Sequence, residues 1–107
     1  MGKEHEFIRA MFDIYITAKR ECKYNPERFR QMVDVQGGVD AAKSLLSKSD
    51  VSDGFGILYE QGRLDLTVEA LVLKSDFKEL FTGRELEEAR QRLRECRFNV
   101  DDWELNN

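Results

Sequence analysis

Residues 4–23 read EHEFIRAMFDIYITAKRECK, and their apolar side chains recur with the period of an α-helix. The residues that form the apolar stripe are Phe7, Ile8, Met11, Phe12, Tyr15 and Ala18. Ile14 and Ile16 widen this stripe, which indicates either deep burial or a second contact surface. We expect one helix over 4–23, and we favour burial because a small domain needs a central helix.

Cap signals mark the next helices. Asn25 suits the N-cap position, and Pro26 suits the first position, of a helix over residues 26–35. Gly37 or Gly38 can take the left-handed backbone conformation that ends this helix. The apolar spacing that follows predicts further helices over residues 39–47 and 53–61.

Residues 64–69, LDLTVE, are compatible with two structures. The strict alternation of apolar and polar residues indicates a strand, whereas the apolar spacing over a longer window also fits a helix. With Thr67 as N-cap, Leu66 and Leu71 would form a hydrophobic staple. The sequence offers no second strand for pairing, and an isolated strand leaves its backbone groups without partners. We therefore predict a helix over 68–73.

A capping box gives the clearest helix boundary in the chain. Thr82 and Glu85 stand three residues apart at the start of a helix whose first turns are acidic and whose last turns are basic. Before this helix, Ser75 and Asp76 can cap a short helical turn. After it, residues 99–107 form a tail, which can dock on the core through Val100 and Trp103 and whose last three residues are expected to fray.

These patterns together predict an all-α fold, namely a compact single-domain bundle of six to seven short helices. The 107 residues form one domain, with a core over about residues 7–98 and the C-terminal tail over 99–107. Apolar residues make up 41% of the chain, which is the fraction typical of a globular protein.

Charge and hydropathy exclude several classes of protein. The net charge of −4 excludes a polycation. No apolar run approaches the length of a membrane helix, and residues 1–10 lack the apolar region of a secretory signal, so we expect a cytoplasmic protein without membrane contact. Cys22 and Cys96 are far apart in sequence and are expected to be reduced thiols. The sequence leaves open whether either thiol is reactive.

Three strings carry a family resemblance: YNPERFRQMVDVQGGVDAAKSLL at 24–46, GFGILYEQGRLDLTVEALVL at 54–73, and FKELFTGRELEEARQRL at 77–93. In this order they resemble a family of small bacterial helical proteins without known function, over roughly residues 7–98. The resemblance implies a bacterial cytoplasmic domain that stands alone or is appended to another domain. It supplies no catalytic or binding residues.

The residue types of a catalytic or metal site do not come together in the sequence. His5 is the single histidine and lies close to the N-terminus, where it serves poorly as a catalytic base. The close ligand pairs of a zinc site are absent. We therefore expect no catalytic residue, no cofactor and no metal ion.

The leading functional prediction is a non-enzymatic interaction or adaptor domain that binds a protein partner. Ile14 and Ile16 exceed a single buried helix face, and Trp103 is a residue type that often anchors interfaces. We predict partner contacts at these three residues. Self-association into a homo-oligomer through the same residues also fits the sequence.

Basic residues support an alternative function, a nucleic-acid-binding accessory domain that uses basic helix faces. Arg90, Arg94 and Arg97 recur at intervals of four and three residues on one side of a helix, and such a stripe can contact phosphates. A second basic group surrounds the first helix junction, at Lys19, Arg20, Lys23, Arg28 and Arg30. We favour the simpler interpretation of a solvated face with ion pairs along the helix.

Overall fold

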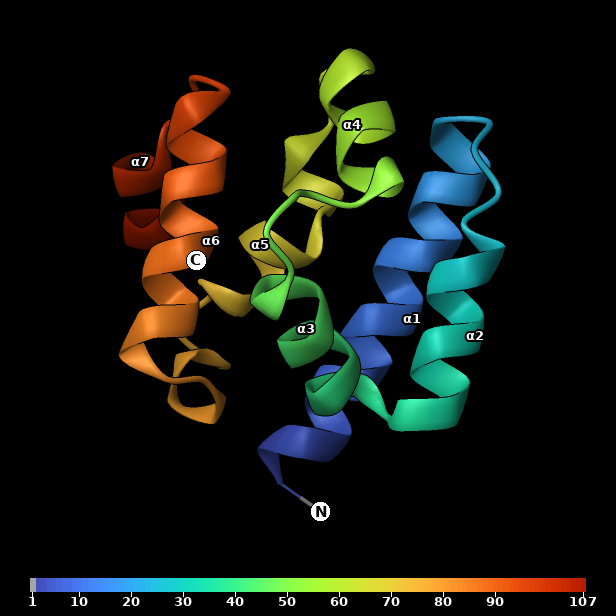
Figure 1. Cartoon of the computed structure of the whole chain (residues 1–107), viewed down its shortest axis with the longest axis horizontal. Coiled ribbons are helices and arrows are strands. Elements are labelled where there is room, and N and C mark those ends of the chain that lie inside the picture. Colours follow the sequence, from blue (N-terminus) through green and yellow to red (C-terminus); the bar gives the residue numbers. More distant parts are fainter. Residues whose placement is uncertain (1) are drawn as a thin grey trace.

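Figure 1 shows the computed structural model, which describes residues 2–107 as helices arranged around a central helix, α5. In chain order the elements are α1 (Lys3–Glu21), α2 (Glu27–Gln36), α3 (Gly38–Ser47), α4 (Asp53–Glu60), the 3₁₀ turn η1 (Leu64–Leu66), α5 (Val68–Val72), the 3₁₀ turn η2 (Lys78–Leu80), α6 (Gly83–Glu95) and α7 (Val100–Asn106). Helices α1 and α2 lie on one side of α5, α6 and α7 lie on the other side, and α3 contacts both groups. The described residues contain seven α-helices and no strand, so the predicted all-α fold is confirmed.

Helix α1 packs its apolar stripe against the rest of the bundle. Phe7 and Met11 are fully buried, and Ala18 is 3% exposed. Ile14 is half-buried, whereas Ile16 is 52% exposed. The widened stripe therefore serves burial over most of its width and leaves one isoleucine at the surface.

The start of α2 differs from the sequence prediction, and the expected Asn25 side-chain cap is wrong. Pro26 is the N-cap residue, and no side chain caps this helix. The backbone N–H of Glu27 donates to the carbonyl of Asn25 over 2.8 Å. The tight turn therefore uses the main chain of Asn25 in place of its side chain.

Gly37 and Gly38 meet different requirements at the junction of α2 and α3. Gly37 has a φ of 86°, a backbone conformation that favours glycine, and it ends α2 as predicted. A Cβ atom on Gly38 would lie 2.9 Å from the Cα atom of Ile8. Helix α3 therefore begins directly against the backbone of α1, and glycine is the residue that permits this approach.

The segment that fits both a strand and a helix is helical. Gly62, with a φ of 71°, follows α4, and η1 then leads into α5. The Oγ1 atom of Thr67 accepts a hydrogen bond from the N–H of Ala70 over 3.1 Å and donates to the carbonyl of Leu64 over 2.7 Å. The predicted Thr67 cap is confirmed. All five residues of α5 are buried, including Glu69.

The predicted capping box at α6 is also confirmed. The N–H of Glu85 donates to Thr82 Oγ1 over 3.1 Å, and the N–H of Thr82 donates to Glu85 Oε1 over 2.9 Å. The short turn before α6 is η2, but neither Ser75 nor Asp76 caps it with its side chain. That part of the prediction is wrong because the Ser75 hydroxyl donates to the carbonyl of Asn107 over 3.0 Å.

The expected fraying of the last three residues is wrong, because most of the C-terminal tail is the helix α7. The Oδ1 atom of Asn99 caps it by accepting a hydrogen bond from the N–H of Asp102 over 3.0 Å. At its end, the carbonyl of Asn107 accepts from the N–H of Ser75 over 2.9 Å. Contacts with residues distant in the sequence therefore hold the C-terminal residues in place.

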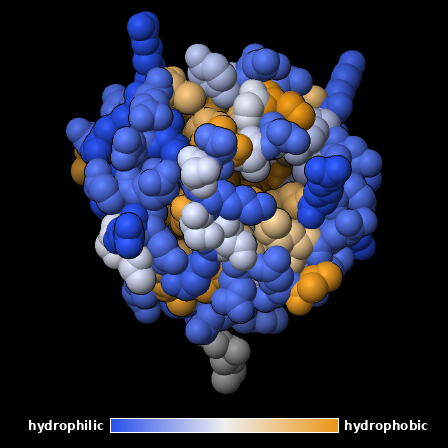
Figure 2. Space-filling view, viewed as in Figure 1, coloured by the Kyte–Doolittle hydropathy of each residue, from blue (hydrophilic) through white to orange (hydrophobic). Residues whose placement is uncertain are grey.

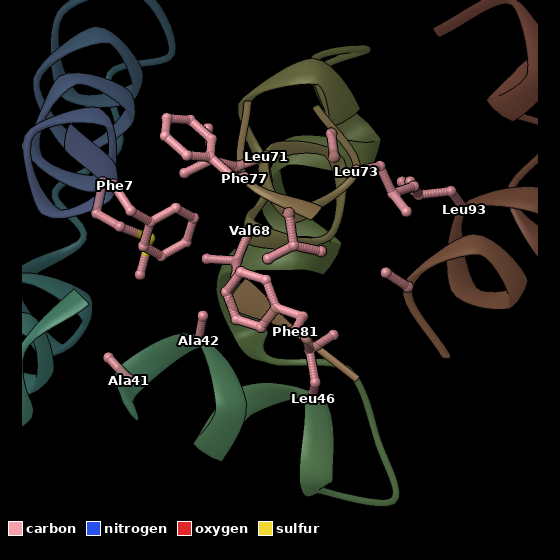
Figure 3. Close-up of a cluster of buried hydrophobic side chains, with 14 of the residues drawn as sticks. Phe7, Ala41, Ala42, Leu46, Val68, Leu71, Leu73, Phe77, Phe81 and Leu93 are labelled. Carbon is pink, nitrogen blue, oxygen red and sulfur yellow. The ribbon is translucent and has the colours of Figure 1, made fainter. Parts of the chain in front are cut away.

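Aromatic rings join the N-terminal and central elements in the core, as Figure 3 shows. The ring of Phe7 meets the rings of Phe77 and Phe81 edge to face, with centroids 5.2 and 5.3 Å apart. Leu73 and Leu93 extend the same cluster toward α6. Burial of each large side chain contributes about 1.5–3 kcal/mol, so this cluster fixes the positions of the helices around it.

Candidate functional site

A cleft of about 600 Å³ lies between α1, α2, α4 and α5, and the loop from α3 to α4 forms one of its walls. Figure 2, viewed as Figure 1 is, shows apolar atoms set back behind polar side chains near the middle of this face. The volume falls within the range of ligand sites in proteins. The large apolar side chains that line the cleft are Ile14, Phe29, Met32, Leu45, Phe55, Leu58, Leu66 and Val68. These come from five helices and η1, so the fold as a whole makes the cleft.

Charged residues stand at the rim of the cleft. Arg28, Lys48, Asp50 and Asp53 line it, and all four are exposed. Their side chains form no ion pair within residues 2–107. The rim therefore presents two cations and two anions to any molecule that approaches.

A buried carboxylate belongs to the cleft lining. Glu69 is 4% exposed, and its Oε2 atom accepts a hydrogen bond from Nη1 of Arg92 over 2.9 Å. Burial raises the pKa of Glu69, and the hydrogen bond from Arg92 opposes this increase. Arg92 does not itself line the cleft, so Glu69 is the member of this buried ion pair that belongs to the lining.

Arg92 is held by partners on three elements. Its Nε atom donates to Glu88 over 2.8 Å, within α6. Nη1 donates to the carbonyl of Leu45 over 3.2 Å, and Nη2 donates to the carbonyl of Lys48 over 2.6 Å. The guanidinium thus joins α6 to the end of α3 and to the start of the loop that forms the wall of the cleft.

Two hydroxyl groups of the lining are already used in helix caps. Ser52 Oγ accepts a hydrogen bond from the N–H of Phe55 over 3.2 Å, and the Thr67 hydroxyl caps α5 as described above. Tyr24 is different: its hydroxyl oxygen would lie 2.7 Å from a Cβ atom on Gly54, so glycine makes room for it. Burial, and then the charge of Asp53, raise the pKa of Tyr24, which keeps its hydroxyl protonated.

The partner contacts predicted from the sequence lie in separate places. Ile14 lines the cleft. Ile16 is exposed on α1 and is not part of the lining. Trp103 and the arginines belong to α7 and α6 or follow α6, on the other side of α5. Of the predicted partner contacts, Ile14 therefore lies at the cleft, and the others do not form a single surface with it.

Trp103 is engaged within the protein. Its Nε1–H donates to the carbonyl of Ala70 over 2.8 Å, and its ring meets the ring of Phe98 at a centroid distance of 5.6 Å. The Nζ atom of Lys74 lies 5.7 Å from the centre of the indole. The described contacts of Trp103 attach α7 to the core, and a role in partner contact stays a prediction.

Two of the three predicted arginines have carboxylate partners. Arg90 donates through Nε and Nη2 to Glu104 over 2.8 and 3.0 Å. Arg94 lies 3.4 Å from Asp101 and 3.7 Å from Glu87. Arg97 is exposed, has a φ of 63°, and forms no ion pair within residues 2–107. These pairs reduce the positive charge that the stripe offers to phosphate groups.

Neither cysteine lines the cleft, although Cys22 belongs to the same buried cluster as the lining residues Leu58 and Leu66. Cys22 is 3% exposed, and Cys96 is half-buried. Burial, and then the charge of Glu95, raise the pKa of the Cys96 thiol, which lowers the fraction of reactive thiolate. Within residues 2–107, no three side chains of the metal-binding types are grouped closely enough to hold an ion.

Sequence reasoning missed Glu69, which lines the cleft, and Arg92, which contacts Glu69 from outside the lining. Glu69 stands inside the apolar run LTVEALVL, and an acidic residue among buried positions indicates a buried cationic partner. Arg92 fits the basic last turns of the helix that begins after Thr82. It adjoins the buried Ala89 and Leu93, and this adjacency is the signal that could have identified it.

Comparison with models of protein families gives no match to this chain. Neither the curated proteins nor the solved structures contain a match. The resemblance to small bacterial helical proteins therefore stays a prediction. Among residues 2–107, no helix is both long and apolar enough to cross a membrane.

Proposed function

We propose that this chain is an interaction domain, not an enzyme, and that its cleft binds an apolar anchor of a protein partner. The observation that carries the proposal is the cleft of about 600 Å³, whose lining is largely apolar and whose rim bears four charged side chains that form no ion pair with the described residues 2–107. Protein interfaces combine an apolar centre with a polar rim in the same way. We place the domain and its partner in the cytoplasm.

The physical chemistry of the cleft favours such an anchor. Aliphatic and aromatic side chains in the lining contact water when the cleft is empty, and removing apolar surface from water contributes about 25 cal/mol per Å². The rim charges of both signs would orient the partner and would discriminate against segments with the wrong charge pattern. The apolar lining would therefore provide the affinity for the partner, and the charged rim would provide the selectivity.

The alternative function, nucleic-acid binding through basic helix faces, has less support. Arg90 and Arg94 are paired with carboxylates. The two cations at the rim of the cleft stand beside two anions. We therefore treat nucleic-acid binding as an outcome that the experiment below must distinguish.

Val51 and Val35 offer a matched pair of substitutions for this experiment. Val51 is 41% exposed and lines the cleft, whereas Val35 is 84% exposed on α2 and lies outside the lining. Tagged native protein, Val51→Lys and Val35→Lys would be recovered from the source cells with and without nuclease. Quantitative mass spectrometry would identify the bound proteins, and purified partner would then be titrated against each variant.

We expect Val51→Lys to weaken binding of the purified partner about tenfold or more, because a charge enters the edge of an apolar interface. Val35→Lys should bind as the native protein does. Equal binding by both variants would overturn the proposal. Recovery that disappears with nuclease would favour the basic helix faces instead, and recovery of this chain alone would favour a homo-oligomer.

A further inference from the structure

The carboxylate of Glu69 has capacity for a further hydrogen bond. An ionised carboxylate accepts about four hydrogen bonds. The described partners of the Glu69 carboxylate are Nη1 of Arg92, which donates to one oxygen, and the backbone N–H of Glu69 itself. Arg92 is restrained by Glu88 and by two backbone carbonyls, so its contact holds the carboxylate in place. A ligand in the cleft can therefore approach an acceptor whose position is already fixed.

The other polar groups of the lining compete weakly for this role. The hydroxyls of Ser52 and Thr67 each accept a backbone N–H in a helix cap. The Tyr24 hydroxyl can donate as well as accept, and it stands near the rim beside Asp53. Glu69 is thus the strongest hydrogen-bond acceptor among the buried residues that line the cleft.

Taking the cleft as the partner site proposed above, we infer that the anchor is a tryptophan side chain whose indole N–H donates to Glu69. Indole combines a large apolar body with a single donor and no acceptor. The body suits walls formed by Phe29, Leu58 and Val68, and the donor suits the carboxylate. Phenylalanine would displace water from Glu69 without replacing its hydrogen bond, and an acidic anchor would be repelled.

Small aromatic probes test this inference without knowledge of the partner. Indole has the N–H donor, 1-methylindole has the same ring without it, and benzothiophene has a similar shape without any donor. Each would be titrated into the full ¹⁵N-labelled chain, and the amide signals of Gly54, Phe55 and Val68 would report on the cleft. Amide signals are preferred to fluorescence because the chain contains its own Trp103.

We expect indole to bind about tenfold more tightly than benzothiophene or 1-methylindole, with the largest shifts at the cleft amides. In Glu69→Gln, which keeps an acceptor for Arg92, this preference should become smaller. The double variant Glu69→Met with Arg92→Met removes both charges together, and in it the preference should disappear. Circular dichroism would verify that each variant is folded.

The outcomes separate the two proposals. Equal binding of the three probes at the cleft would overturn the indole inference and would leave the proposed function in place. A preference for indole that persists in the folded double variant would also overturn the inference. If no probe shifts the cleft amides, both the inference and the proposed use of the cleft fail.

Discussion

Glu104 joins α7 to two other elements through charged hydrogen bonds. Arg90 of α6 contacts both carboxylate oxygens over 2.8 and 3.0 Å, and Nζ of Lys78 in η2 lies 2.7 Å from Oε1. Glu104→Gln would keep the size of the side chain and remove its charge. We expect this substitution to destabilise the protein, because one neutral amide cannot replace three charged hydrogen bonds.

The pKa of Glu104 indicates how much unfolding free energy the substitution should remove. The hydrogen bond from Arg90, and then that from Lys78, hold this pKa at about 2, against an ordinary value of 4.5. At about 1.4 kcal/mol per pKa unit, the upper bound for the contribution of the charge is about 3.5 kcal/mol. The side chains of Arg90 and Lys78 are 25% and 33% exposed, so solvent screening lowers the expected loss to about 1–2 kcal/mol.

The direction of the pKa shift determines how the stabilisation by Glu104 changes with pH. The folded-state pKa lies below the unfolded value, so the stabilisation is complete above about pH 4.5 and is lost as the pH falls toward 2. Urea unfolding followed by circular dichroism would compare the native protein with Glu104→Gln at about pH 7, 4.5 and 3. The difference in unfolding free energy should be constant between the first two values and smaller at the third.

Glu79 provides the matched control, since it is exposed and forms no ion pair within residues 2–107. Glu79→Gln should change the unfolding free energy by less than about 0.5 kcal/mol. An equal loss in both variants would refute the reasoning. A loss in Glu104→Gln that is as large at about pH 3 as at about pH 7 would refute it as well.

Three further substitutions test the packing, with thermal and urea unfolding as the measurements. Gly38→Ala should lower the free energy of unfolding by about 1–3 kcal/mol, because its Cβ would clash with the backbone of α1. Gly56→Ala has open space around it and should raise the stability of the protein. Equal effects of the two substitutions would contradict the close approach of α3 to α1. Thr82→Ala should cost about 1 kcal/mol through loss of the capping box, and a neutral result would count against the box. Arg92→Met should lower the free energy of unfolding by about 3–5 kcal/mol, because it leaves the buried Glu69 without its cation. Adding Glu69→Met should restore most of this stability. A loss below about 1 kcal/mol in Arg92→Met would contradict the burial of the pair.

Local signals in the sequence predicted most of the fold. The caps at Thr67 and Thr82 depend on residues within three positions, so the sequence contains all the information that they need. The same is true of Gly37 and Gly62, which end helices with positive φ angles. Asn25 shows the limit of such signals. The sequence predicts a cap by its side chain, but in the turn at Pro26 the N–H of Glu27 bonds to the backbone carbonyl of Asn25 instead.

The C-terminal helix depended on contacts that no local pattern contains. Its attachment uses the indole of Trp103 on the carbonyl of Ala70, and the carbonyl of Asn107 on Ser75. These partners are more than 30 residues away in the chain. The composition of residues 105–107 alone therefore predicts fraying, whereas tertiary contacts hold α7 and Asn107 in place.

The cleft was unpredictable from sequence for a similar reason. Its lining comes from α1 through α5, and each contributing side chain follows the ordinary pattern of a core residue. Ile14 was identified because it widened the apolar stripe of α1. Phe29 and Leu58 gave no such signal, because only the assembled fold shows that they border an opening and not another side chain.

The buried pair of Glu69 and Arg92 connects the stability of this protein to its proposed function. A buried ion pair adds little net stability, since the cost of desolvating the two charges offsets most of their attraction. Here the pair fixes a carboxylate in the cleft lining and ties it to the carbonyls of Leu45 and Lys48, where the wall of the cleft begins. Such fixing lowers the ordering cost of binding. Apolar replacements of both residues would preserve the packing but remove this arrangement, so unfolding and binding measurements on the double variant report on separate properties of the same pair.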